Sequence, residues 1–392
     1  MDLGALLGAS IILFTGLALG KLISLLRLPN VTGYLIGGLL IGPSVLGIIS
    51  DEMIGNLEFI SQISLAFIAF SIGLSFKFNY LKRMGLTPFV ITILEATLAV
   101  LFVQIVLFLA GFELPLVLFL GSIAAATAPA ATVMVIRQYR AKGPVTDMLL
   151  SVVAIDDAVA IVLFGFSATI AQTMIGSVPS TSLTLSLLTP IFDIIIAIII
   201  GVIVAVIVKY LFKVFTTRGG QLSVLLAGVL LTTGLAIMFN VSDLLANMAL
   251  GLVVTNISLE AQVMDDMIEY ITPPIYMMFF VLSGAKLQLN VITSIGLIGI
   301  IYIVFRVAGK IAGARLGAEI MKTSSNVKKY LGPMLIPQAG VAIGLATSAE
   351  NLLPEHSAQI TAVVLVATLI YELVGPVITK ISLQRAGEIS DD

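Results

Sequence analysis

Long runs of apolar residues, separated by short polar or glycine- and proline-containing segments, make up nearly all of the 392-residue chain. A helix needs about 20 such residues to cross the hydrocarbon core of a bilayer. Dividing the chain at charged residues, glycine–proline clusters and polar runs predicts thirteen transmembrane helices, and therefore an all-α polytopic membrane protein. The predicted spans are residues 3–26, 30–49, 57–76, 86–110, 114–137, 145–175, 187–214, 221–240, 242–259, 262–283, 289–318, 328–349 and 357–384.

The basic residues predict the orientation, because cytoplasmic loops carry an excess of lysine and arginine. With the N-terminus outside and the C-terminus inside, 17 of the 20 basic residues lie on the cytoplasmic side. Lys286 alone falls outside, and Arg306 and Lys310 fall within a span. Losing one helix would invert every later loop, so this distribution favours thirteen spans. The seventeen residues are Lys21, Arg27, Lys77, Lys82, Arg83, Arg137, Arg140, Lys142, Lys209, Lys213, Arg218, Arg315, Lys322, Lys328, Lys329, Lys380 and Arg385.

Proline interrupts the fifth and the twelfth predicted spans. Pro129 follows Thr127 in the fifth, and Pro333 and Pro337 lie in the twelfth. Proline removes a backbone donor and disrupts the preceding turn. In a membrane, the freed carbonyl groups are tolerated where they are buried in protein or line a wet cavity. Each interruption taken singly is equally consistent with a kink used only for packing.

The two interrupted spans occupy matching positions in two groups of three, spans 4–6 and spans 11–13. These groups start seven spans apart, an odd number, so they run through the membrane in opposite directions. Paired interrupted segments in inverted repeats point to a transport site near the bilayer midplane. We therefore expect inverted repeats in which helices 5 and 12 are broken.

Deep charged residues are concentrated in these same six spans. A charge at bilayer depth costs at least about 2.5 kcal/mol and usually faces a polar cavity or pathway. Two neighbouring aspartates also repel each other, so at least one is expected to be protonated or neutralised by a cation. Competition between a proton and a cation for one carboxylate couples the two fluxes; the alternative is a buried structural ion pair. The residues are Glu95, Asp156, Asp157, Arg306, Lys310 and Glu372.

Arg306 and Lys310 lie one helical turn apart, on the same face. Arginine stays charged under physiological conditions, whereas a buried lysine can lose its proton. We therefore interpret Arg306 as a permanent counter-charge. Lys310 either compensates the aspartates or extends its side chain to the cytoplasmic interface.

The remaining polar residues within the spans have a structural alternative. Asp157, with Asp156 beside it, would bind a hard cation through oxygen, and monovalent and divalent cations both suit such ligands. Thr127 would be a further oxygen ligand or a cap of the break. Glu95 and Glu372 are interpreted as structural partners within the membrane. Gln338 is interpreted as a cap of a half-helix end, and Asn247 as a residue of interhelical packing or hydrogen bonding.

Composition narrows the class of protein. Hydrophobic residues make up 59% of the chain and charged residues 11%, whereas soluble domains carry roughly 25% charged residues. The chain lacks cysteine, and its one histidine, His356, falls in a predicted loop, so a thiolate site, a histidine metal site or a catalytic triad is not expected. The first apolar run lacks a basic leader and a cleavage site, which favours a helix over a signal peptide. We expect neither an enzyme nor a bound cofactor.

Motifs spread in order along the chain resemble those of the monovalent cation/proton antiporters, in particular the bacterial sodium/proton and potassium/proton exchangers with thirteen spans. The resemblance rests on LPNVTGYLIGGLLIGP at residues 28–43, FSIGL at 70–74, TAPA at 127–130, the aspartate pair at 156–157, and residues 306–313.

The resemblance implies a homodimer in the cell membrane, in contact with lipids, monovalent cations and protons. It also implies elevator transport, with the two broken helices crossing beside the aspartates, Asp157 as the ion-binding carboxylate and Asp156 as its neighbour. The implied parts are a dimerisation domain (1–85 and 219–286, helices 1–3 and 8–10), an ion-transporting core (86–180 and 287–384, helices 4–6 and 11–13), a linker helix 7 (181–218) and a cytoplasmic tail (385–392).

One departure from the family pattern concerns stoichiometry. Members that move net charge carry a lysine facing the aspartates, at the position aligned here with Arg306. An arginine there would remove one exchangeable proton, which predicts electroneutral exchange. A shift in register would put Lys310 in the facing position instead. Only a short tail follows the last span, which favours a free-standing exchanger over one with a nucleotide-binding domain.

Exchange of sodium for protons is the leading hypothesis for function. Lithium is a possible substitute for sodium, and potassium/proton exchange of the potassium-efflux type is the nearest alternative. A sodium-coupled organic-anion symporter shares the inverted-repeat design, but adjacent acids would repel an anionic substrate. A membrane receptor or scaffold would have no use for charges clustered in matching repeats.

Overall fold

Every regular element in the described part of the chain is a helix, so the all-α prediction is confirmed there. The computed structural model describes residues 3–74, 85–175, 183–287, 289 and 295–389; the predicted cytoplasmic residues Lys77, Lys82 and Arg83 lie outside these ranges. The helices are α1 (Leu3–Leu25), α2 (Asn30–Ile41), α3 (Asp51–Asn56), α4 (Glu58–Leu74), α6 (Thr87–Leu109), α7 (Leu114–Ile123), α8 (Pro129–Gln138), α9 (Pro144–Met174), α10 (Leu183–Val214), α11 (Arg218–Met238), α12 (Asp243–Ile257), α13 (Ala261–Ala285), α14 (Gly296–Ile320), α15 (Ser325–Tyr330), η3 (Gly332–Leu335), α16 (Gly340–Leu352), η4 (Pro354–His356) and α17 (Ser357–Ala386).

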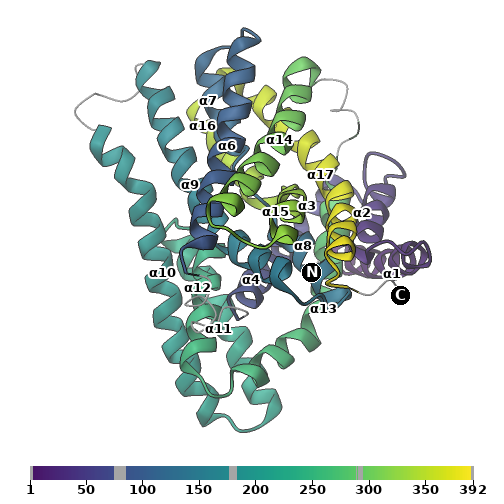
Figure 1. Ribbon diagram of the computed structural model, residues 1–392. Helices are drawn as coiled ribbons and strands as arrows, with labels where there is room; N and C mark the ends of the chain where they lie inside the picture. The colour runs from purple at the N-terminus through teal and green to yellow at the C-terminus, as the bar shows by residue number, and fades with distance from the viewer. Residues whose placement is uncertain (1–2, 75–84, 176–182, 288, 290–294, 390–392) are drawn as a thin grey trace. The chain divides into compact units, whose positions relative to one another are not determined.

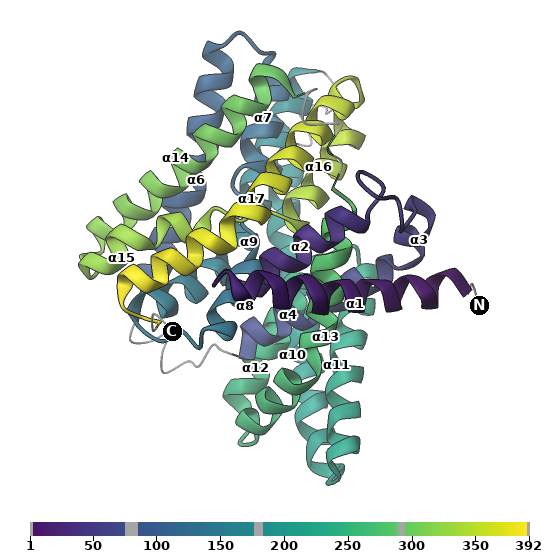
Figure 2. The ribbon, with the colours of Figure 1, turned by 90° about the vertical axis from the view of Figure 1, so that its right-hand side faces the viewer.

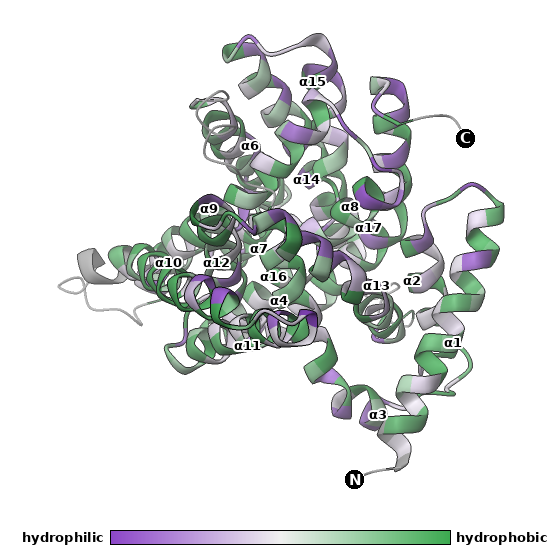
Figure 3. Ribbon diagram, turned by 90° about the horizontal axis from the view of Figure 1, so that it is seen from below, coloured by the Kyte–Doolittle hydropathy of each residue, from purple (hydrophilic) through white to green (hydrophobic). Residues whose placement is uncertain are grey.

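Eight of the described helices are long and apolar enough to cross a bilayer: α1, α6, α9, α10, α11, α13, α14 and α17. Helix α10 is hydrophobic along almost its whole length (Figure 3). Four further apolar helices, α2, α4, α7 and α12, have only 10–17 residues. Helix α2 is shorter than its predicted span because Gly42 leaves the helix in an extended conformation just before Pro43. The count of thirteen spans and their orientation stay predictions.

Packing divides the chain into two compact units. Unit 1 comprises Met1–Phe14, Asp51–Gly85 and Ile191–Ser283, and unit 2 comprises Thr15–Ser50, Leu86–Pro190 and Gly284–Asp392. The predicted division into dimerisation domain, linker and core concerns movement, which packing in a single conformation does not test.

In unit 1, α4 and α12 pack closely where Gly73 of α4 meets Gly251 of α12. A β-carbon added to Gly73 would lie 2.2 Å from the carbonyl oxygen of Met248, so no larger residue fits without a shift. Small residues allow membrane helices to approach in this way. On α12, Asn247 Nδ2 donates a hydrogen bond of 2.9 Å to Thr233 Oγ1 of α11, which confirms its predicted interhelical role.

In unit 2, α6 and α14 lie side by side (Figures 1 and 2). Three glycines of α14, spaced four residues apart, form the contact: Gly309, Gly313 and Gly317. A β-carbon on Gly313 would lie 2.4 Å from the Leu94 carbonyl oxygen and 2.5 Å from the Glu95 α-carbon. This close approach brings the α14 residues between the glycines next to the middle of α6.

We expect Gly313→Ala to destabilise the protein by about 1–3 kcal/mol, because the added methyl group meets backbone atoms that side-chain rotation cannot move away. The control is Gly234→Ala on α11, where nothing lies within 4 Å of the added carbon; there, alanine should be neutral or stabilising, since it favours the helix. Thermal unfolding of the two purified variants is the measurement. Equal melting temperatures would contradict the close approach of α6 and α14.

Two non-helical segments lie inside unit 2, at residues 124–128 between α7 and α8 and at 336–339 between η3 and α16. Pro129 is the first residue of α8, and Pro337 lies in the second segment. The backbone N–H of Ala128 donates to the Pro337 carbonyl oxygen at 2.8 Å, so the two segments are bonded to each other. Helices α9 and α17 each contact all four pieces, α7, α8, η3 and α16.

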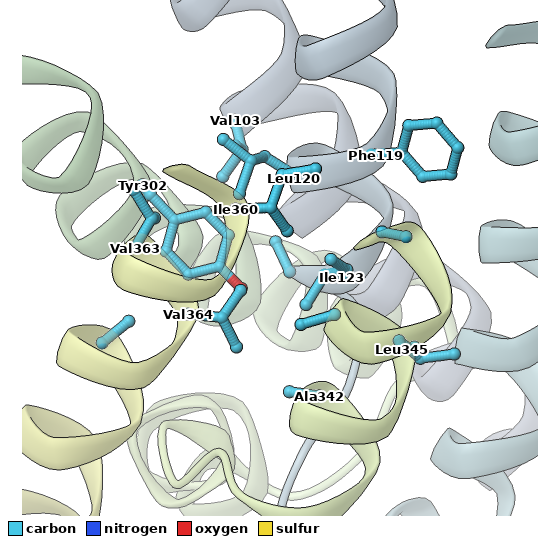
Figure 4. Close-up of a cluster of buried hydrophobic side chains, with 14 of the residues drawn as sticks. Val103, Phe119, Leu120, Ile123, Tyr302, Ala342, Leu345, Ile360, Val363 and Val364 are labelled. Atoms are coloured by element: carbon cyan, nitrogen blue, oxygen red, sulfur yellow. The ribbon is translucent and has the colours of Figure 1, made fainter. Parts of the chain in front are cut away.

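A buried apolar cluster of unit 2 surrounds these segments. Figure 4 shows side chains of this cluster from α6, α7, α14, α16 and α17, with the Tyr302 ring among them. Because protein interiors are close-packed, such a cluster fixes the helices that carry the polar residues. It comprises among others Val103, Leu120, Ile123, Tyr302, Ala342, Ile360, Val363 and Val364.

Candidate functional site

The two aspartates lie near the middle of α9 and are buried, Asp156 with 0% and Asp157 with 1% of its surface exposed. Glu388, which follows α17, holds the first turn of this helix. The N–H groups of Val145 and Thr146 donate to the Glu388 carboxylate at 2.6 and 2.7 Å. A carboxylate at a helix N-terminus satisfies free donors and complements the helix dipole. Sequence reasoning missed Glu388, because it lies more than 240 residues further along the chain.

Lys310 is the centre of the polar cluster. Its Nζ lies 2.6 Å from Glu95 Oε2 and 3.4 Å from the nearer Asp156 oxygen, and it donates to Thr127 Oγ1 at 2.8 Å. All the charged partners are fully buried. The alternative in which Lys310 reaches the cytoplasmic interface is therefore wrong. Of the two partners predicted for Glu95, Lys310 is the one in contact with it, and the structural role of this contact stays a prediction.

Arg306 holds the two non-helical segments together. Its guanidinium donates to the carbonyl oxygens of Ala124 at 3.1 Å, Ala126 at 2.7 Å and Ile336 at 2.7 Å. The guanidinium carbon also lies 4.6 Å from the centre of the Tyr371 ring. Carbonyl groups beyond the end of a helix need such donors, and Arg306 supplies them to both non-helical segments.

The predicted facing position of Arg306 needs correction. The side chain that reaches Asp156 is Lys310, whereas Arg306 donates to backbone carbonyl groups. The two residues are one turn apart on the same face of α14, so spacing alone left the register open. The argument for electroneutral exchange from an arginine in place of lysine therefore loses its premise.

Gln338 joins the second segment to the first. Its Nε2 donates to the Ile123 carbonyl oxygen, the last residue of α7, at 3.0 Å, and it also bonds with the Tyr302 hydroxyl. Gln338 thus donates to the last carbonyl group of α7, as the predicted cap of a half-helix end would. Tyr302 was not predicted; the available signal was its position one turn before Arg306 on α14.

Glu372 lies in unit 2, but it is not among the residues that contact Lys310. It lies on α17 and is 2% exposed. It has no hydrogen bond or ion pair with any described residue, and its structural role stays a prediction. Pro337 lies against α17 close by, since a β-carbon on Gly375 would be 2.6 Å from its Cγ.

The charges of the cluster do not balance. Glu95, Asp156 and Asp157 supply three carboxylates, and Lys310 and Arg306 two cations, so one negative charge remains when all five are ionised. Buried charges need compensation. One proton or one monovalent cation would complete the balance. Among the described residues, no group of three or more acidic, histidine or cysteine side chains could hold a resident metal ion.

Comparison with known proteins gives a family and a fold. The sequence profile described as "Sodium/hydrogen exchanger, transmembrane" matches residues 9–384. Two structures of the sodium proton antiporter MjNhaP1 from Methanocaldococcus jannaschii are similar at 20% sequence identity. The structure at pH 8 has a TM-score of 0.72 and covers 97% of this chain and 98% of its own. The electron-microscopy structure has a TM-score of 0.78 and covers 100% of both chains. No curated protein matches the sequence.

Proposed function

The chain belongs to the sodium/hydrogen exchanger family, and from this premise we propose that it exchanges sodium ions for protons as a secondary-active antiporter. It is a multi-pass membrane protein. Within it, Asp157 and Asp156 are the carboxylates that bind either a sodium ion or a proton. Thr127, whose hydroxyl already accepts from Lys310, offers a further oxygen at the same place.

The observation that carries this proposal is the single unbalanced negative charge of the buried cluster. Asp156 shares the Lys310 ammonium with Glu95, and Asp157 is the next residue of α9. A buried excess charge is costly until a cation or a proton neutralises it. Either ligand satisfies the same need, so binding of one excludes the other. Exclusion of this kind couples an outward flux to an inward one.

The ion pair between Lys310 and Glu95 favours one cation per proton. At 2.6 Å this contact is the shorter of the two that Lys310 makes with carboxylates. When sodium takes Asp156, the ammonium keeps Glu95 as its partner and need not lose its proton. We therefore propose electroneutral exchange, now on the basis of Glu95 rather than of Arg306.

The mechanical part of the proposal is elevator transport by a homodimer with inverted repeats and crossing broken helices. Its support is that α9 and α17 each contact both interrupted helix pairs, as repeats would require. In this proposal, residues 86–180 and 287–384 move as the core, and residues 1–85 and 219–286 form the dimer scaffold. The seventh predicted span, residues 181–218, links the two parts.

Purified protein in liposomes tests the exchange and its stoichiometry. We expect sodium to dissipate a preformed pH gradient, read by recovery of a quenched dye, with lithium and potassium compared over several pH values. A thiocyanate diffusion potential, imposed without a sodium or pH gradient, should then move no protons. Proton movement under voltage alone would rule out the electroneutral part. No response to any of the three cations would overturn the proposed function.

A further inference from the structure

Helix α17 carries a second buried carboxylate that the exchange at Asp157 does not use. Thr368, Glu372, Gly375 and Thr379 are spaced by four, three and four residues, so they share one face of the helix. Gly375 lies against the ring of Pro337. This face of α17 therefore meets the non-helical segment at 336–339, in the way that α9 meets the pieces of α7 and α8.

The cations near this face are already engaged. Arg306 on α14 donates to three carbonyl oxygens. Lys380, two turns further along α17, donates to the Arg27 carbonyl oxygen and lies 4.9 Å from the centre of the Tyr139 ring. Among the described residues, none is paired with Glu372. Other titratable groups on elements that contact α17 include Tyr302 and Lys310 on α14, Asp147, Asp156 and Asp157 on α9, Arg137 on α8, Tyr34 on α2, Lys328, Lys329 and Tyr330 on α15, and Glu355 and His356 on η4.

Two oxygen atoms on this face of α17, the Thr368 hydroxyl and the Glu372 carbonyl oxygen, lack the hydrogen bond that a helix normally provides. Some buried helix threonines donate to the carbonyl oxygen four residues earlier, as Thr92 does to Pro88 at 2.8 Å and Thr232 to Gly228 at 2.9 Å, whereas Thr32 on α2 and Thr379 on α17 make no hydrogen bond with any described residue. The Thr368 hydroxyl, although buried, makes no hydrogen bond with any described residue. Pro376 has no N–H group, so it cannot donate the helical hydrogen bond to the carbonyl oxygen of Glu372, four residues before it.

We propose that Glu372, with the Thr368 hydroxyl one turn before it, forms a second site that binds one positive charge, either a proton or a monovalent cation. The carboxylate is buried without a counter-ion, so the ion must come from solution. Oxygen ligands suit both candidates. This inference rests on the proposed cation/proton exchange, and competition at the second site keeps the ratio of one cation per proton.

Proton uptake and sodium binding by the purified protein test the second site. We expect Glu372→Gln to take up one proton fewer per protomer than the unaltered protein in a titration across the stable pH range. A count of bound ²²Na⁺ then separates the two ions: one sodium fewer identifies a cation that competes with the proton, and an unchanged count identifies a proton alone. Thr368→Val should weaken the second sodium or shift the titration while the Glu372 carboxylate remains. Identical proton uptake and sodium counts in Glu372→Gln and the unaltered protein would overturn the proposal.

Glu355→Gln is the matched control, since the same change is made on an exposed side chain of η4 and should leave buried proton uptake unaltered. Asp157→Asn separates the two proposals. In that variant, exchange should stop while the Glu372 proton is still titrated. Continued exchange by Asp157→Asn would contradict the proposed ion site at Asp157. The proposed site at Glu372 would then be decided by the proton uptake and sodium count of Glu372→Gln alone.

Discussion

Asp157→Asn is expected to abolish sodium/proton exchange, with transport in liposomes falling to the level of empty vesicles. Asparagine keeps the size of the side chain but can hold neither the proton nor the charge that attracts a cation. Asp157 is 1% exposed, on a helix whose neighbouring residue Asp156 already shares Lys310 with Glu95.

Asp266→Asn provides the control for this loss. Asp266 is an exposed residue of α13, where the same change removes a charge from the surface, and transport should remain at the unaltered rate. Asp156→Asn should lie between the two, since Glu95 still holds Lys310, with a lower apparent affinity for sodium. Full exchange by Asp157→Asn would contradict the assignment of Asp157 as the ion-binding carboxylate.

Lys310→Gln is expected to cause the largest loss of stability. The ammonium of Lys310 contacts Glu95 at 2.6 Å and Asp156 at 3.4 Å, with every partner fully buried. Removing one partner of a buried ion pair costs about 3–5 kcal/mol, because a charge is left without compensation. The melting temperature in detergent should drop accordingly.

A second change should rescue much of this loss. In the double variant Lys310→Gln with Glu95→Gln, one of the two carboxylates that lose the ammonium is also removed, and two amides can bond to each other. The combined effect should therefore be below the sum of the single effects. Lys329→Gln, an exposed residue of α15, is the control and should be nearly neutral. A double variant no more stable than Lys310→Gln would show that the uncompensated Glu95 charge is not the cause of the loss.

The fold and much of the cluster could be predicted because their causes are local. Apolar runs of sufficient length predict helices, and Pro129 and Pro337 mark the positions of the two non-helical segments, Pro129 at the end of one and Pro337 within the other. Charges this deep in apolar segments had to find partners, so the grouping of Glu95, Asp156 and Lys310 followed from cost alone.

The roles of Arg306 and Lys310 could not be separated in the same way. Both lie on one face of α14, and which of them reaches Asp156 depends on the rotation of α14, which the glycines against α6 fix. Tyr302 was missed because an apolar neighbourhood hides a hydroxyl that bonds with Gln338. Contacts between distant segments leave no local signal.

The clamp of Glu388 on the first turn of α9 has a practical consequence. It ties the residue after the last helix to the beginning of the aspartate-bearing one. A spin label or fluorophore attached at Ile389 would therefore report the displacement of α9 during the cycle rather than the random motion of a free end. A label at Ile389, just after α17, would therefore follow the movement of the aspartate-bearing helix in the proposed transport step.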